Sequence, residues 1–256
     1  EPGNTYTVDI EIPDQPVKGR ILLDKKGLQF VGVKTETDAC GNEVQRPIFE
    51  ERYLAGAVFE VRAAEEVVGA DGRVWYQQDE LVDTITTTAN GSDASSELPL
   101  GKYYLQEAAS PAGYVLDDQE RIIDLSYRDS RTAVVTYSED WQNERQKARV
   151  KVVKLDENTE EPLPGASFGL YAEEDICSAS GTVIIAAGTL IQQLATDSNG
   201  ELIFEADLPV GFSYSIKELI PPAGYASDPD VRSFTFEASS TNSTVTDFEY
   251  VFVDKP

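Results

Sequence analysis

One arrangement of residues occurs twice in this chain, in the same order. Residues 54–60 read LAGAVFE and residues 163–169 read LPGASFG; farther along, residues 103–114 read YYLQEAASPAGY and residues 214–225 read YSIKELIPPAGY. An internal repeat on this scale indicates two structural units of one kind. At 256 residues the chain is long enough for two domains of ordinary size, so we predict two similar domains in tandem.

Each copy also carries three polar residues at matched places. A lysine ends a strand-like run before the shared motif, a glutamate lies inside the second shared segment, and an asparagine or aspartate lies in the closing run. These residues are Lys25, Glu107 and Asn143 in the first copy, and Lys154, Glu218 and Asp254 in the second. The interval from the glutamate to the closing residue is the same in both copies (143 − 107 = 36 and 254 − 218 = 36).

The local sequence is typical of β-strands throughout. Short runs rich in Val, Ile, Thr, Tyr and Phe alternate with polar residues, and turns such as ANGS (89–92) and DSNG (197–200) separate them. No long segment shows a helical period of apolar residues. We therefore predict an all-β fold with two tandem immunoglobulin-like β-sandwiches.

The alternation of side chains along a strand places these polar residues on the apolar face. Lys154 shares its face with Val150 and Val152, and Glu218 shares its face with Tyr214 and Ile216. By the same rule Lys25 and Glu107 point inward in the first copy. The closing strands place Asn143 with Trp141 and Asp254 with Phe252. Glu139 also falls on the face of Trp141, and the sequence offers no reason for it.

Two interpretations of these inward polar residues are open. Burying such groups is costly, and a buried ion pair would compensate for that cost without any reaction. Asn143, however, carries no charge and cannot form an ion pair with Lys25. Together with the duplication, this favours a reaction between the side chains.

The domain boundary is expected between residues 146 and 147, which gives domains 1–146 and 147–256. The first copy is longer before the shared motif (56 − 25 = 31 against 165 − 154 = 11), and the extra residues predict an inserted hairpin around 28–50 at the sandwich edge. Residues 8–16 (VDIEIPDQP) resemble the closing YVFVDKP. Residues 1–16 are therefore interpreted as the last strand of a preceding module.

Composition excludes several function classes. A net charge of −25 argues against binding nucleic acid or anionic membranes. The absence of histidine leaves no His-based zinc site or catalytic triad, and we expect no cofactor and no metal. Residues 156–161 (DENTEE) and 197–201 (DSNGE) lack full calcium-loop spacing and are better explained as turns.

The two cysteines, Cys40 and Cys177, make no disulfide framework. No stretch is apolar enough to span a membrane.

The order of these motifs resembles a known family. A lysine strand, then L-x-G-A-x-F, then Y-x-x-x-E-x-x-x-P-x-G-Y, then a closing strand with Asn or Asp is similar to the Cna B-type (SpaA-like, prealbumin-like) domains of Gram-positive pilins and surface adhesins. The resemblance implies a spontaneous isopeptide bond between the first-strand lysine and the last-strand Asn or Asp, promoted by the glutamate. Residue by residue, it implies Lys25–Asn143 with Glu107, and Lys154–Asp254 with Glu218. The second copy uses Asp in place of the commoner Asn.

The chemistry also follows from the residue types. Burial disfavours charged forms, so a neutral amine and a protonated carboxyl become accessible. The amine then attacks the Asn143 or Asp254 carbonyl, the protonated glutamate hydrogen-bonds the carbonyl oxygen, and ammonia or water leaves. Effective molarities of roughly 10⁵–10⁸ M explain how an amide forms unaided. Each site turns over once, so the chain is not expected to be an enzyme.

The resemblance implies a structural stalk module of a cell-wall-anchored pilin or adhesin at the surface of a Gram-positive bacterium. Its partners would then be neighbouring modules of the same polypeptide or pilus. A sortase signal is not visible, since ELPLG (97–101) and PLPG (162–165) read better as turns. The alternative is a binding module for a host protein or glycan, centred on the insertion with Tyr53, Trp75 and Tyr76. An enzyme with a carboxylate pair is the least favoured interpretation.

Overall fold

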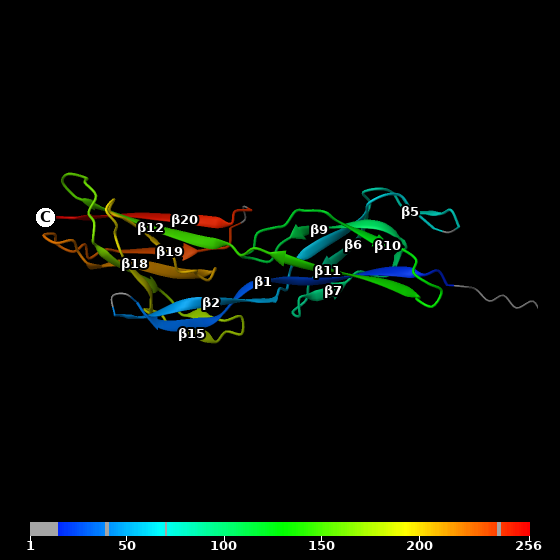
Figure 1. Ribbon diagram of the computed structural model, residues 1–256, viewed down its shortest axis with the longest axis horizontal. Helices are drawn as coiled ribbons and strands as arrows, with labels where there is room; N and C mark the ends of the chain where they lie inside the picture. The colour runs from blue at the N-terminus through cyan, green and yellow to red at the C-terminus, as the bar shows by residue number, and fades with distance from the viewer. Residues whose placement is uncertain (1–14, 39–40, 70, 240–241) are drawn as a thin grey trace, which may run out of the picture.

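The computed structural model describes residues 15–38, 41–69, 71–239 and 242–256. All regular secondary structure in these ranges is β-strand, and it forms two sandwiches placed end to end along an elongated molecule (Figure 1). None of the described segments is a helix of the length and apolarity that crossing a membrane requires. Residues 1–14, interpreted above as part of a preceding module's strand, and Cys40 lie outside the described residues.

Two sheets and one small hairpin build the first domain. The first sheet contains β11 (Val134–Asn143), β1 (Lys18–Thr37) and β2 (Glu43–Tyr53), with β7 (Ser92–Ala94) and β8 (Leu98–Pro99) also paired to β1. The second sheet runs in the order β10 (Arg121–Leu125), β9 (Gly101–Ala109), β3 (Val58–Ala63) and β6 (Leu81–Thr86). The hairpin consists of β4 (Val67–Val68) and β5 (Val74–Tyr76).

The second domain repeats this plan. One sheet contains β17 (Glu201–Phe204), β12 (Lys147–Asp156) and β20 (Val245–Asp254). The other runs in the order β16 (Leu190–Ala195), β13 (Ser167–Ala172), β18 (Phe212–Ile220) and β19 (Val231–Phe236). A hairpin of β14 (Ile176–Cys177) and β15 (Val183–Ile185) corresponds to β4–β5.

In each domain the first and last strands lie side by side and parallel. β1 pairs with β11 so that Lys25 lies opposite Trp141, and β12 pairs with β20 so that Lys154 lies opposite Phe252. The alternation predicted from the sequence holds here: Trp141 and Asn143 are buried, and Gln142 between them is exposed. The apolar faces of both sheets meet in one core per domain. This parallel pairing brings the start and the end of each domain together.

The inserted residues form the distal half of the β1–β2 hairpin, and this half leaves the first sandwich to lie on the second (Figure 1). Phe30 and Val33 pack against the core of the second domain, and Val44 is fully buried. Asn42 Nδ2 donates a hydrogen bond of 2.6 Å to Gln193 Oε1. The sequence predicted a hairpin at the edge of the first sandwich; the structure shows that it bridges the two domains.

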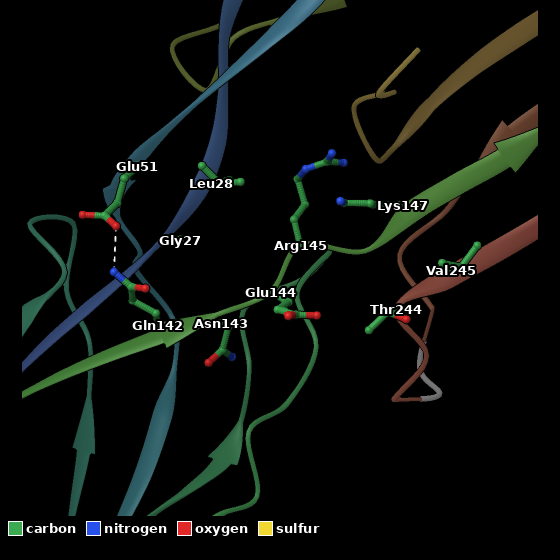
Figure 2. Close-up of a pocket in the computed structure, with 10 residues that line it drawn as sticks. All are labelled: Gly27, Leu28, Glu51, Gln142, Asn143, Glu144, Arg145, Lys147, Thr244 and Val245. Carbon is green, nitrogen blue, oxygen red and sulfur yellow. Dashed lines mark hydrogen bonds between the residues drawn. The ribbon is translucent and has the colours of Figure 1, made fainter. Parts of the chain in front are cut away.

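The linker between the domains is short and well packed. The first domain ends with β11 at Asn143 and the second begins with β12 at Lys147. Arg145 stacks 3.8 Å from the centre of the Phe49 ring and forms an ion pair with Asp207. A cavity of about 590 Å³ remains at this junction, where Gln142 Nε2 donates a hydrogen bond of 2.7 Å to Glu51 (Figure 2). The hairpin and the linker therefore hold the two sandwiches in one arrangement.

Candidate functional site

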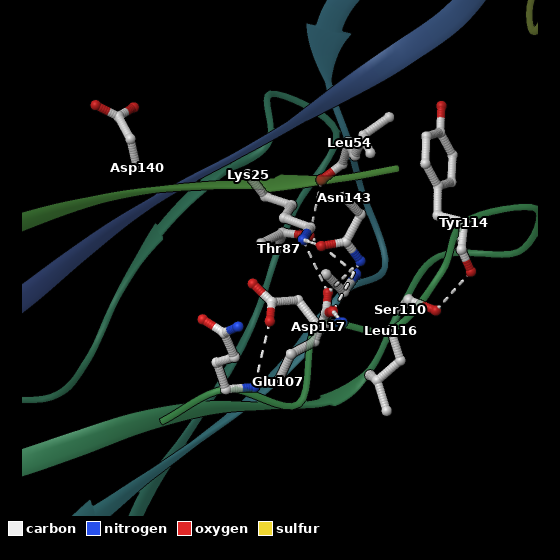
Figure 3. A network of polar contacts seen from close by, with 12 residues as sticks. Lys25, Leu54, Thr87, Glu107, Ser110, Tyr114, Leu116, Asp117, Asp140 and Asn143 are labelled. Atoms are coloured by element: carbon white, nitrogen blue, oxygen red, sulfur yellow. Dashed lines mark hydrogen bonds and ion pairs between the residues drawn. The ribbon is translucent and has the colours of Figure 1, made fainter. Parts of the chain in front are cut away.

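Lys25, Glu107 and Asn143 come together inside the first sandwich (Figure 3). Lys25 Nζ lies 2.9 Å from Glu107 Oε1 and donates a hydrogen bond to Asn143 Oδ1. Asn143 Nδ2 donates to both oxygens of Glu107, at 2.9 and 2.7 Å. The three residues are only 0%, 2% and 6% exposed. An amine, a carboxylate and an amide are thus in mutual contact with almost no access to water.

Three strands place these side chains. Lys25 on β1 and Asn143 on β11 project from one sheet, and Glu107 on β9 reaches them from the other sheet. The register of β3 with β9 shifts between Val58 and Phe59, which places a bulge beside Glu107. A bulge changes the direction of a side chain next to it. Here it accompanies the turn of Glu107 toward the buried lysine.

The second sandwich contains the matching cluster. Lys154 Nζ lies 3.0 Å from Glu218 Oε1 and donates a hydrogen bond to Asp254 Oδ1. These residues are 0%, 8% and 1% exposed. The register of β13 with β18 shifts beside Glu218, between Ser167 and Phe168, so the bulge is repeated as well. Both sequence-predicted sets of residues are therefore assembled in the same way.

Backbone donors fix the orientation of the two glutamates. The Asp117 N–H donates to Glu107 Oε2 at 2.9 Å, and the Asp228 N–H donates to Glu218 Oε2 at 2.7 Å. The Ser227 hydroxyl adds a bond of 3.0 Å to the same oxygen of Glu218. The sequence analysis missed these supporting residues. The only sequence signal for these residues is their position: Asp117 in the first domain and Asp228 in the second follow the shared P-x-G-Y motif at the same distance.

Aromatic rings enclose each lysine. Lys25 Nζ lies 5.4 Å from the centre of the Phe59 ring, which packs edge-on against Trp141 at 5.0 Å. Arg121 stacks on Trp141 at 3.7 Å and its Nη1 binds Glu139 at 2.7 Å. This contact explains why Glu139 lies on the same face as Trp141, which the sequence analysis left without a reason. In the second domain Phe168 and Phe252 take the places of Phe59 and Trp141 around Lys154.

Burial shifts the protonation of both clusters toward neutral forms. Desolvation lowers the pKa of Lys25 below its usual value, against the opposing hydrogen bond and charge of Glu107. Desolvation likewise raises the pKa of Asp254, against the hydrogen bond from Lys154. A neutral Lys25 is a nucleophile, and a protonated Asp254 has a hydroxyl that can leave as water. Both shifts therefore favour amide formation.

The contacts of the glutamates differ from the sequence expectation in one respect. We expected a protonated glutamate to hydrogen-bond the acyl carbonyl oxygen. In the structure Glu107 contacts the amine and the amide nitrogen of Asn143, and the carbonyl oxygen faces Lys25. A carboxylate can only accept hydrogen bonds, so it turns to the N–H groups. This geometry suits transfer of a proton from the amine to the leaving nitrogen.

The two clusters should differ in their response to alkaline pH. Reaction at Lys25 needs a neutral amine, so its rate rises with pH and levels off at the lowered pKa of Lys25. Reaction at Asp254 needs a protonated carboxyl as well as a neutral amine, so its rate falls once the pH exceeds the raised pKa of Asp254. The chain would be recovered unfolded from inclusion bodies, diluted into buffers of graded pH and quenched in acidic denaturant. Mass spectrometry then follows ammonia loss and water loss separately.

Other candidate features are less organised. Within the described ranges no group of three or more Cys, Asp or Glu residues is arranged to hold a metal ion, and Cys177 has a free thiol. Trp75 and Tyr76 lie on β5 at the far end of the first domain from the tip of the inserted hairpin (Figure 1), and Tyr76 packs on the core. Tyr53 lies at the end of β2. The structure thus does not gather these three aromatics around the insertion.

Comparisons with known proteins agree with this architecture. The family model of the SpaA prealbumin-like fold domain matches residues 50–140 and 148–249. The trypsin-resistant surface T6 protein of Streptococcus pyogenes serotype M6 is 26% identical over 121 residues, which are 46% of this chain and 21% of that protein.

Solved structures also resemble the chain. The Bacillus anthracis TIE protein matches with a TM-score of 0.60 and 24% identity, over 93% of this chain and 34% of that structure. The shaft pilin SpaA of Lactobacillus rhamnosus GG aligns over 94% of this chain and 98% of its own, at 16% identity and a TM-score of 0.33. This chain thus spans about a fifth of the streptococcal protein and about a third of the Bacillus anthracis structure. Because the family model covers most of both sandwiches, the chain belongs to the SpaA prealbumin-like domain family, of which it contains two copies.

Proposed function

We propose that this chain is a pair of stalk modules, each locked by an isopeptide bond that forms without another enzyme. The bonds are Lys25–Asn143, promoted by Glu107, and Lys154–Asp254, promoted by Glu218. The observation that carries the proposal is the water-excluded contact of amine, carboxylate and acyl group, which occurs in both sandwiches. A plain buried ion pair does not account for Asn143, whose side chain is uncharged.

The reaction at the first site balances as follows. The neutral Lys25 Nζ attacks Asn143 Cγ, a C–N bond forms, and a tetrahedral intermediate results. Glu107, which contacts both nitrogens, accepts a proton from the attacking amine and delivers it to Asn143 Nδ2. The bond from Cγ to Nδ2 breaks and ammonia leaves. The Lys25 amine and the Asn143 amide are replaced by one secondary amide, and Glu107 is regenerated.

The second site follows the same course with water as the leaving group. Lys154 Nζ attacks Asp254 Cγ and a hydroxyl departs with a proton relayed by Glu218. Asp254 Oδ2 is buried and has no hydrogen-bond partner among the described residues. Protonation of Asp254 supplies the donor that Asn143 supplies through Nδ2 in the first site. In both sites the fold holds the reactants together, which is the source of effective molarities of roughly 10⁵–10⁸ M.

The positions of the bonds suit a protein that carries tension. In each domain the linked residues lie on the adjacent first and last strands, so a pull on the ends passes along a short stretch of β1 or β12, through the bond, and out. The loops enclosed by the bonds span 118 and 100 positions. Residues inside these loops carry no load. A bacterial surface location, anchored to the cell wall through other parts of the parent, is part of this proposal; the streptococcal relative is named a surface protein.

Pulling on single molecules tests the proposal directly. With both bonds closed, we expect stretching from the two ends to give no unfolding step, because neither loop can extend. Glu107→Gln should release one step from the first domain, and Glu218→Gln one step from the second. The matched control is Asp140→Asn, which alters an exposed ion pair with Lys26 beside the first cluster and should leave the chain inextensible. Unfolding steps from both domains of the unaltered chain would refute the mechanical role of the bonds.

A further inference from the structure

The junction between the two domains contains a docking surface on the second domain. We call it the inner seat and define it by Cys177, Pro209 and Val210. The first domain covers it with its P-x-G-Y loop, residues 111–114, and with the base of the β1–β2 hairpin. The contact is close: a Cβ atom added at Gly113 would lie 2.9 Å from Val210 Cγ1.

The first domain carries the equivalent surface at its opposite end. The Tyr103 hydroxyl donates to the Pro99 carbonyl at 2.7 Å, as the Tyr214 hydroxyl donates to the Pro209 carbonyl at 2.6 Å. This equates Pro99 with Pro209, and therefore Leu100 with Val210.

The small hairpins match in the same way. The Gly69 N–H donates to the Arg73 carbonyl in β4–β5, and the Ser178 N–H donates to the Thr182 carbonyl in β14–β15. This correspondence equates Val68 with Cys177 and Trp75 with Ile184.

We call this equivalent surface the outer seat, defined by Val68, Trp75, Pro99, Leu100 and Tyr127. It encloses a cavity of about 610 Å³ with a largely apolar lining. Val68, Trp75 and Tyr127 are 46%, 39% and 58% exposed, and Lys18 Nζ and the Arg73 guanidinium lie 5.1 and 4.7 Å from the centre of the Trp75 ring. In the second domain the residue equivalent to Trp75, Ile184, is packed against the core. An exposed apolar surface of this kind marks an interaction site.

The second domain carries the complementary loop at the other end of the molecule. Residues 222–225 repeat the P-x-G-Y loop in the second domain. A Cβ atom added at Gly224 would meet no atom of the described residues within 4 Å, whereas one at Gly113 would meet Val210. The molecule thus shows one assembled seat-and-loop contact and presents the two separate halves of the same contact at its ends.

The path of the chain also points to a domain of the same kind. Pro16 and Val17 line the outer seat, so the first described residues of the chain lie at that surface. In the sequence Asp14 stands eleven positions before Lys25, and Asn143 stands eleven positions before Lys154 (25 − 14 = 11 and 154 − 143 = 11). Asp14 therefore has the same position relative to the first domain as Asn143 has relative to the second. We propose that the outer seat binds the P-x-G-Y loop of another SpaA prealbumin-like domain, joined in tandem through the residues before Gln15.

A tandem fusion tests this proposal. Residues 1–254 of one copy are joined to residues 15–256 of a second, so that Asp254 takes the place of Asp14. Trp75 is the reporter, because the only other tryptophan, Trp141, is fully buried. In the single chain, acrylamide should quench the Trp75 emission. In the fusion we expect the quenchable emission per chain copy to fall by about half, since one of the two outer seats is covered.

Leu100→Asp, made either in the first or in the second copy of the fusion, provides the control. Leu100→Asp in the second copy should restore full quenching, because it places a charge in the occupied seat. Leu100→Asp in the first copy, whose seat is free, should leave the shielding unchanged. Equal quenching in the fusion and the single chain would overturn the proposal, and so would restoration by both variants. Concentration-dependent shielding in the single chain would assign the seat to a separate copy instead. None of these outcomes depends on isopeptide formation, which the mass of the same sample reports independently.

Discussion

The folded chain should weigh less than its sequence by one ammonia and one water. The ammonia is lost when Lys25 joins Asn143, and the water when Lys154 joins Asp254. The effect is all-or-none at each site, because the reactants are in contact in both buried clusters and a closed amide is stable once formed. Intact-mass measurement on denatured protein resolves the two losses. The sequence mass in a sample with both domains folded would refute bond formation.

Variants of the glutamates separate the two sites. Glu107→Ala should restore the ammonia and leave the water loss in place, and Glu218→Ala should do the reverse. The matched controls are Lys26→Ala and Lys151→Ala, which remove partly exposed lysines near each cluster and should keep both losses. A deficit that persists in Glu107→Ala and Glu218→Ala would show that the glutamates do not promote the reaction. Peptide mapping should then recover branched peptides that contain Lys25 with Asn143 and Lys154 with Asp254.

The second large effect is on stability. Closing loops of about 100 residues is worth roughly 4–5 kcal/mol in the chain-entropy model of cross-links. At about 4–8 °C per kcal/mol for a domain near 100 residues, removal of one bond should lower the Tm of that domain by on the order of 20 °C. Lys25→Met with Glu107→Leu tests the first domain, and Lys154→Met with Glu218→Leu and Asp254→Asn tests the second. Differential scanning calorimetry should show the altered domain melting first.

These combined substitutions are chosen because they leave no unpaired charge; in the second domain Asp254→Asn is needed as well, since Asp254 also pairs with Lys154. A single change such as Lys25→Met would strand Glu107 in the core, and that cost would be mixed with the loss of the bond. Replacing a buried pair by apolar residues of similar size is often neutral, so the drop in Tm then reports the cross-link. As a control, Arg149→Ala removes an exposed ion pair with Asp247 and should change the free energy of unfolding by no more than about 1 kcal/mol. A Tm that stays within a few degrees in these combined variants would contradict covalent locking.

Much of the candidate site could be predicted from the sequence, because the relevant pattern is local. The two-residue alternation along a strand placed Lys25 with Ile21 and Leu23, and Glu107 with Tyr103 and Leu105, and all of these residues are buried. The repeat supplied a second, independent instance of each position. The interval from the glutamate to the closing Asn or Asp is the same in both copies. This match allowed residues on different strands to be assigned to one site. The fold class followed for the same reason, since short alternating runs between turns admit few architectures.

The tertiary structure decided how distant segments meet. The bulge beside Glu107 and the stacking of Arg121 on Trp141 depend on how the strands pair and the sheets pack. The hairpin crosses to the second domain, where Asn42 meets a residue 151 positions away.

The contact of Glu107 with the amide nitrogen was likewise settled only in three dimensions. Alternation along a strand tells which face a side chain occupies, and it carries no information about what another strand brings to that face. The sequence by itself therefore determined the inward-facing amine, acid and acyl residues. Their contacts, and the open seat at the end of the first domain, came from the packing of elements far apart in the chain.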